Sequence, residues 1–208
     1  MTRPLRADAA RNRRELLRAA AEEFRENGVG VPIADIARRA GVGKGTVFRH
    51  FATKEQLLAA IVIDRLDALS ELGESLAGAA DAEAALHEFL AASVEQQQDQ
   101  NISFLYAASP DILSAPEVTR AQQRMFRSVY VLVERAQRQG AVRDDVTGPD
   151  VVLLMCAPGH AAEPLAQLSP QLWRRYLAVL LDGLRPEGAR DLPHPAPAHP
   201  LPAVAPLA

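Results

Sequence analysis

The side chains best suited to binding chemistry are concentrated between residues 44 and 54. Within this short segment, two lysines, one arginine and one histidine are interleaved with two threonines and two phenylalanines. Ammonium and guanidinium groups donate strong hydrogen bonds to anionic oxygens, and the guanidinium fork matches the two acceptors on a guanine edge. The segment therefore carries the groups needed to contact phosphates and base edges. The candidate residues are Lys44, Gly45, Thr46, Phe48, Arg49, His50 and Lys54.

The residues around these groups predict two short helices joined by a tight turn. Residues 33–50 carry apolar or small side chains at helical spacing, interrupted by the sequence Gly-Val-Gly. Ala37 is small enough for two helices to approach closely, and Gly41 can adopt the positive φ that the turn requires. Val47 and Phe51 would anchor the last helix to the core. Its other residues are then free to face outward, as a recognition helix requires.

This segment resembles the TetR family of regulators. The resemblance covers residues 10–62 and is carried by the pattern I-A-x-x-A-G-V-x-x-G-T-V-F-x-H-F-x-x-K-E-x-L-L. It implies an all-α fold, with a three-helix N-terminal helix-turn-helix domain and a larger helical domain that binds an effector and dimerises. The implied function is that of a sequence-specific, ligand-responsive regulator, a repressor that a small molecule releases from a palindromic operator. Activation stays open, because it depends on where the operator lies.

The resemblance also implies roles for individual residues. Lys44 and Thr46 lie where the family contacts phosphates or base edges, and Arg49 is the candidate for sequence readout. His50 and Lys54 lie where contacts to the DNA backbone are expected. Such contacts set affinity and register rather than sequence.

Two positions depart from the family pattern. Gly43 stands where a serine or threonine usually caps the recognition helix, and Phe48 stands where many members have a tyrosine. Each change removes a side-chain hydrogen bond to phosphate. We expect the arginines of the N-terminal segment to compensate electrostatically. They are Arg3, Arg6, Arg11, Arg13 and Arg14.

The charge distribution along the chain agrees with this interpretation. The net charge is −3, but residues 1–56 hold ten arginines and two lysines against seven acidic residues, a net +5. The remaining residues carry a net −8. A basic N-terminal segment followed by an acidic remainder is expected when one end of a protein meets phosphate. No run of about 18 apolar residues suggests a membrane span, and we expect a cytoplasmic protein.

Helical periodicity predicts the elements that position these groups. A long helix is expected to start at an N-cap formed by Thr53 with Gln56 and to fade near Gly78, so that it links the two domains. Ser169 and Pro170 are expected to start the last helix. The other helices are expected at residues 10–27, 33–40, 44–50, 82–98, 101–108, 115–139, 149–164 and 170–184. The domains are expected as a flexible basic arm (1–9), the helix-turn-helix domain (10–56), the ligand-binding and dimerisation domain (57–188) and a proline-rich disordered tail (189–208).

The C-terminal domain is expected to hold the effector pocket and the dimer interface. Aromatic, sulfur-containing and polar residues are the pocket candidates, and a kink at Pro158 and Gly159 could open space for them. They are Phe89, Phe104, Tyr106, Met125, Phe126, Tyr130, Met155 and His160. The apolar stripe of the last helix supplies the dimer candidates, although it could instead face the core of its own chain. They are Trp173, Tyr176, Leu177 and Leu180.

Two other classes of function remain as alternatives. An enzyme could use Cys156 with His160, four residues apart, but no orienting acid or oxyanion motif accompanies them. His160 with Glu163 supplies two metal ligands, which do not make a site. A single cysteine excludes an internal disulfide framework. A nucleoid-type protein that binds DNA without a specific operator is the second alternative. We expect no enzymatic activity, no metal and no cofactor.

Overall fold

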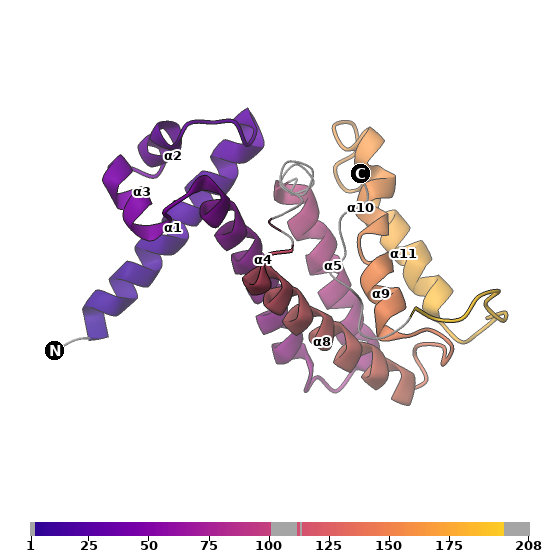
Figure 1. Cartoon of the computed structure of the whole chain (residues 1–208). Helices are drawn as coiled ribbons and strands as arrows, with labels where there is room; N and C mark the ends of the chain where they lie inside the picture. The colour runs from indigo at the N-terminus through magenta and orange to yellow at the C-terminus, as the bar shows by residue number, and fades with distance from the viewer. Residues whose placement is uncertain (1–2, 101–111, 113, 198–208) are drawn as a thin grey trace. The chain divides into compact units, whose positions relative to one another are not determined.

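The computed structural model describes residues 3–100, 112 and 114–197, and within these residues every regular element is a helix. The all-α prediction is therefore confirmed. The helices are α1 (Arg3–Asn27), α2 (Ile33–Arg39), α3 (Lys44–His50), α4 (Lys54–Leu76), α5 (Ala82–Gln100), α8 (Pro116–Arg138), α9 (Gly148–Leu154), α10 (Ala157–Ala162), the 3-10 helix η1 (Glu163–Leu165) and α11 (Leu172–Leu184) (Figure 1). The helix expected over 101–108 lies outside the described residues. Among the described residues, no helix is long and apolar enough to cross a membrane.

The chain divides into two compact units within α4. Residues up to Arg65, together with the start of α8 up to Thr119, belong to the first unit, and Leu66 begins the second. The first turns of α4 supply a run of buried apolar side chains, including Leu57, Leu58 and Ile61. The division within α4 therefore lies further along the helix than the boundary expected after residue 56, and α4 belongs to both units.

Helix α1 is longer than its apolar periodicity predicts. It begins at Arg3, so the start expected at residue 10 is wrong. Pro4 does not prevent this early start, because a proline in the first helical turn sacrifices no intrahelical hydrogen bond. The helix ends at Gly28, whose φ of 76° is accessible to glycine and whose N–H donates to the Phe24 carbonyl at 2.8 Å.

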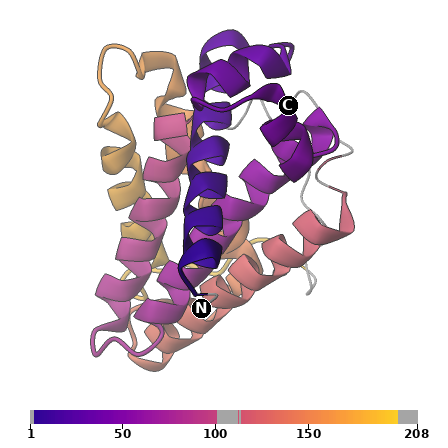
Figure 2. The same cartoon turned by 90° about the vertical axis from the view of Figure 1, so that its left-hand side faces the viewer.

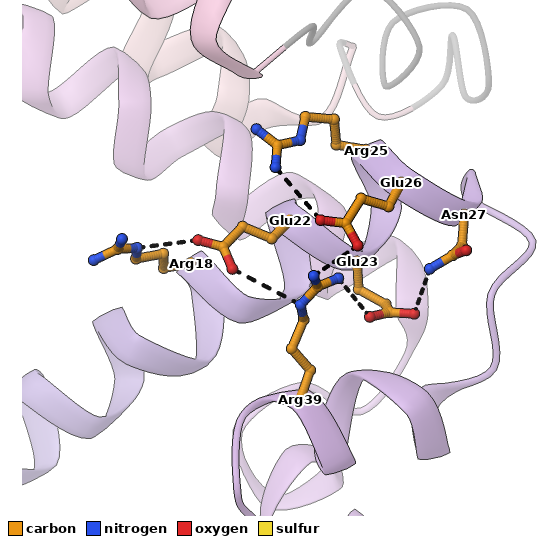
Figure 3. Close-up of polar contacts among 7 residues, drawn as sticks. All are labelled: Arg18, Glu22, Glu23, Arg25, Glu26, Asn27 and Arg39. Atoms are coloured by element: carbon orange, nitrogen blue, oxygen red, sulfur yellow. Dashed lines mark hydrogen bonds and ion pairs between the residues drawn. The ribbon is translucent and has the colours of Figure 1, made fainter.

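Helix α2 packs on α1, and α3 in turn packs on α2 (Figure 1; Figure 2). An ionic cluster joins α2 to α1. The guanidinium of Arg39 lies 2.7 Å from Glu23, 2.6 Å from Glu26 and 3.8 Å from Glu22 (Figure 3). Glu23 is buried and also accepts a hydrogen bond from the Asn27 amide at 2.7 Å. A buried carboxylate needs such partners, because desolvation without them is costly. Arg39 therefore fixes α2 against α1.

Helix α4 begins with the predicted cap, in a slightly different form. The N–H of Gln56 donates to Thr53 Oγ1 at 3.2 Å, as expected. The Gln56 side chain, however, accepts from the N–H of Ala52 at 2.9 Å rather than from that of Thr53. The first bond satisfies a donor that the helix start leaves without an intrahelical partner, and the second holds the residue that precedes the cap.

In the second unit, side chains of α8 hold the turn between α4 and α5. Arg135 donates to the carbonyls of Leu76 and Ala79. The Gln139 amide donates to the Ala80 carbonyl and accepts from the N–H of Ala82, both at 2.9 Å. These bonds satisfy backbone groups at the end of α4 and the start of α5.

The helix expected over 149–164 is broken into three pieces. Pro158 causes the interruption, but the break falls at Met155 and Cys156, ahead of the expected kink. A proline has no N–H to donate to the carbonyl four residues earlier, so the regular backbone hydrogen bonds of the helix are interrupted before the proline itself. Thr147 and Asp150 cap α9 reciprocally. The last helix begins at Leu172 with Gln171 as its N-cap, so the expected start at Ser169 and Pro170 is wrong.

We predict that replacing Arg39 with methionine lowers the melting temperature by a few degrees, because the buried Glu23 loses its cationic partner. The hydrogen bond from Arg39 also lowers the pKa of Glu26 below its ordinary 4.5. A lowered carboxyl pKa stabilises the fold above the ordinary value, and this stabilisation is lost as the pH falls through the lowered value. The difference between wild type and variant, measured by thermal melts followed by circular dichroism, should therefore shrink below pH 4.5.

The matched control is Arg38→Met, the neighbouring arginine on the same helix. Arg38 is exposed and pairs with Asp35 alone. An equal loss of melting temperature in the two variants would contradict a special role for Arg39.

Candidate nucleic-acid interface

The turn between α2 and α3 has the geometry that the sequence predicts. Gly41 adopts a φ of 66°, where a side chain would be strained. Its N–H donates to the Arg38 carbonyl at 3.2 Å, and the N–H of Val42 donates to the Ala37 carbonyl at 3.0 Å. These two bonds form a Schellman motif, which ends α2 and directs the chain into α3.

Helix α3 is anchored along one side and open along the other. Val47 and Phe51 are buried, as predicted, and Thr46 is half-buried. The remaining candidates face solvent, and Phe48 is 52% exposed although its ring is apolar. An exposed phenylalanine next to exposed cations suits a surface that meets a partner rather than a packed core. The exposed candidates are Lys44, Gly45, Phe48, Arg49 and His50.

Gly43 caps α3 through its backbone alone. It has the extended conformation of an N-cap, with a φ of −75° and a ψ of 150°, and its carbonyl accepts from the N–H of Thr46 at 2.9 Å. No side chain caps this helix. The predicted loss of a capping hydrogen bond at this position is therefore confirmed.

Lysine and arginine side chains that have no carboxylate within ion-pair distance are concentrated on α3 and on part of α1. Five arginines of the first unit pair with acidic neighbours, as Arg11 does with Glu15 and Arg18 does with Glu22. Among the side chains described between residues 11 and 54, a few cations lie beyond ion-pair distance of any carboxylate. They are Arg13, Arg14, Lys44, Arg49 and Lys54. This partition was not apparent from the sequence, because it depends on which arginines the fold brings to an acid.

Lys54 has a structural contact of its own. Its ammonium donates to the Val29 carbonyl at 3.0 Å and is half-buried. The contact ties the start of α4 to the loop after α1. A phosphate at this position would bind an ammonium group that already donates a hydrogen bond to the Val29 carbonyl.

The expected effector-pocket residues include four that are buried and two that the structure does not describe. Phe89, Met125, Phe126 and Met155 are buried, as a pocket or a core requires. Phe104 and Tyr106 lie outside the described residues.

Tyr130 and His160 have different surroundings. Tyr130 is half-buried, and its ring packs so closely on the backbone of Gly148 that a Cβ there would lie 2.0 Å from the ring. His160 is exposed and lies 3.7 Å from the Glu163 carboxylate, which does not fit an enclosed pocket. A hollow of about 160 Å³ lies elsewhere in the second unit, beside Leu86, Val142 and Leu184.

Two of the expected dimer contacts lie in the core of the chain. Trp173 and Leu177 are 1% and 2% exposed in the single chain, which favours the alternative that the stripe faces the core of its own chain. Tyr176 and Leu180 are half-buried. The apolar stripe predicts that these side chains are buried, but not whether the core of their own chain or a partner chain buries them. Exposed apolar side chains occur instead at Leu153, Leu154, Leu165, Leu168 and Val179.

The alternative of a cysteine-dependent enzyme finds no support in the site around Cys156. Desolvation raises the pKa of the Cys156 thiol above its ordinary value, although a hydrogen bond from Gln97 acts in the opposite direction. The reactive form of cysteine is the thiolate, which a raised pKa disfavours. The nearby His160 lies at the surface, 3.7 Å from the Glu163 carboxylate.

Comparison with known proteins places these features in a family. The family model for bacterial regulatory proteins of the TetR family matches residues 16–61. The model for the C-terminal domain of SbtR-like transcriptional regulators matches residues 81–186, about half of the chain.

Individual relatives agree with the family models. The HTH-type transcriptional regulator TtgR of Pseudomonas putida is 36% identical over 84 residues, which are 40% of this chain and 38% of TtgR. The crystal structure of a TetR transcription regulatory protein from Mycobacterium vanbaalenii is 33% identical, with a TM-score of 0.67 over 88% of this chain and 99% of that one. The regulator SCO0520 from Streptomyces coelicolor is 24% identical, with a TM-score of 0.68 over 84% of this chain and 98% of that one. The chain belongs to the TetR family of DNA-binding transcriptional regulators.

Proposed function

We propose that this transcriptional regulator acts as a homodimeric repressor that occupies a palindromic operator and leaves it when a small molecule binds. The observation that carries the proposal is the face of α3. Lys44 and Arg49 are exposed there without a carboxylate within ion-pair distance, beside the exposed ring of Phe48. The turn after α2 holds that face in a fixed orientation, as major-groove recognition requires.

The side chains of α3 divide into two tasks. Arg49 lies in the second half of the helix, and its guanidinium can donate to both acceptors of a guanine edge. Lys44, at the helix start, provides charge for phosphate and carries no sequence information. Phe48 lacks the hydroxyl of a tyrosine and offers its ring to a thymine methyl. Thr46 can donate to a phosphate or a base.

Dimerisation follows from the operator geometry and from the exposed apolar side chains of the second unit. Two recognition helices read one face of DNA when they are about 34 Å apart, which requires two copies of the chain. Leu153 and Leu154 on α9, together with Val179 on α11, are exposed in the single chain. Exposed leucine and valine side chains on helices are typical of a surface that a partner covers. We therefore assign the dimer contact to α9 and α11, with Tyr176 and Leu180 at its edge.

Release by an effector requires a path from the second unit to α3. Helix α4 belongs to both units, and Lys54 at its start binds the carbonyl of Val29 in the first. An effector beside Phe89, Phe126 and Tyr130 would favour a conformation in which the two recognition helices are wrongly spaced. The effector acts by its differential affinity for the two conformations, so it shifts their populations.

A footprint on genomic DNA tests the proposal against a nucleoid-type function. We expect protection of one short palindrome at low protein concentration, with the surrounding DNA unprotected. Uniform protection at all concentrations would instead support a protein without a specific operator, and an absence of any protection would refute both.

We predict different losses for Arg49→Ala and Lys44→Ala. The arginine variant should lose about 1–3 kcal/mol of operator binding and discriminate less at one base pair, because a bidentate contact disappears. The lysine variant should bind operator and random DNA more weakly by the same factor, with a salt slope reduced by about 1. Fluorescence anisotropy over a salt series measures both effects. Equal behaviour of the two variants would contradict the division of tasks.

We predict that Leu153→Glu combined with Val179→Glu yields a monomer, because two charges would be buried at the interface. Sedimentation velocity measures the mass. The control is Leu192→Glu, an exposed leucine outside the helices, which should leave the dimer intact. A dimer that survives both substitutions would place the interface elsewhere.

We predict that an effector, identified in a thermal-shift screen, weakens operator binding at concentrations that raise the melting temperature. A ligand that binds the native state stabilises it, so the two effects should share one dissociation constant. Phe126→Ala should raise that constant and leave operator affinity in the absence of ligand unchanged. A tight operator complex that no stabilising ligand weakens would refute allosteric release.

A further inference from the structure

Arg13 makes an unusual contact for an arginine of the first unit. Its guanidinium carbon lies 5.3 Å from the centre of the Phe51 ring, over the ring face. Phe51 is almost fully buried, whereas Arg13 is exposed. The arginine therefore covers the outer face of a core aromatic ring while its charged end stays in water.

The charge of Arg13 is not neutralised by a neighbour. The arginines two positions before it and five positions after it on α1 pair with Glu15 and Glu22, respectively. The side chains that the structure describes place no carboxylate within ion-pair distance of Arg13. Contact with a ring face supplies no oxygen acceptor, so the guanidinium N–H groups stay available for one.

The ring that holds Arg13 belongs to the end of the recognition helix. Phe51 is the C-cap of α3, and its N–H donates to the Val47 carbonyl at 2.9 Å. The ring of His50 lies 6.2 Å from that of Phe51, tilted by 44°. Arg13, although it comes from α1, therefore lies beside the last residues of α3.

We infer that Arg13 is a phosphate-binding residue of the DNA interface, held in place by the ring of Phe51. The inference rests on the proposed DNA-binding function and extends the interface from α3 to α1. The ring restricts the guanidinium before DNA arrives, so that less rotamer freedom is lost on binding. Its ligand is a phosphate of the DNA backbone next to the bases that α3 reads. Such a contact adds affinity for any DNA sequence.

The test compares Arg13→Met with Arg18→Met in full-length protein. Methionine keeps an apolar chain against Phe51 but removes the charge and the donors. Arg18 lies on the same helix, is exposed and is paired with Glu22, so its substitution removes the same charge. The measurement is the dependence of DNA affinity on salt, for operator and for random DNA.

We expect Arg13→Met to weaken binding to both DNAs several-fold and to reduce the salt slope by about 1, the value for one lost phosphate contact. Arg18→Met should leave the slope at the wild-type value. Arg13→Lys should keep the slope while losing part of the affinity, because lysine keeps the charge but cannot place a planar group over the ring.

Other outcomes overturn the inference. An unchanged slope in Arg13→Met, with or without a lower melting temperature, would mean that Arg13 only covers Phe51. An equal change of slope in Arg18→Met would mean that only the net charge of α1 matters. If Arg13→Met fails to fold, Arg13→Gln replaces it, and the same slope decides. A wild-type protein that binds no DNA would instead refute the proposed function itself.

Discussion

The orientation of the recognition helix depends on the ionic cluster between Arg39 and the carboxylates of α1. Helix α2 has seven residues, and an isolated helix of that length is not stable in water. Its position is set by Ile36 and Ala37, which pack inward, and by Arg39, which binds Glu23 and Glu26. Apolar contacts alone would permit small rotations of α2. A guanidinium between fixed carboxylates restricts them, and α3 follows α2 through a turn with defined backbone angles.

The same cluster explains how a protein with a net negative charge can present a positive surface. Carboxylates of α1 are engaged by arginines on its second half and on α2, so their charge is balanced internally. Among the side chains described between residues 11 and 54, the cations that remain without a carboxylate neighbour lie on α3, at the start of α4 and in the first half of α1. Net charge is a property of the whole chain, but phosphate responds to the local arrangement of charges within about a Debye length.

The sequence predicts the helix-turn-helix well because its constraints are local. The bounds of α3, the positive φ of Gly41 and the burial of Val47 each follow from residue type and spacing. The start of α1 was predicted too late, because the arginine-rich residues before Ala10 lack an apolar stripe, although arginine and alanine favour helix.

Contacts between distant residues could not be predicted in this way. Arg39 lies 13 to 17 positions after its partners on α1, and Arg13 lies far before Phe51 in the chain. Periodicity predicts that Trp173 and Leu177 are buried, but it does not predict whether they pack against their own chain or against a partner chain.

The backbone cap at Gly43 has a consequence for the kinetics and thermodynamics of recognition. The first turn of α3 contains Gly45 and lacks a capping side chain, so this end of the helix should fray and exchange its amide hydrogens rapidly. A phosphate placed there would act as the missing cap. Part of the interface would then become ordered on the DNA, and the ordering entropy would oppose binding. We therefore expect an enthalpy-driven association that is slower than the docking of a rigid helix, because the recognition helix becomes fully ordered only on the DNA.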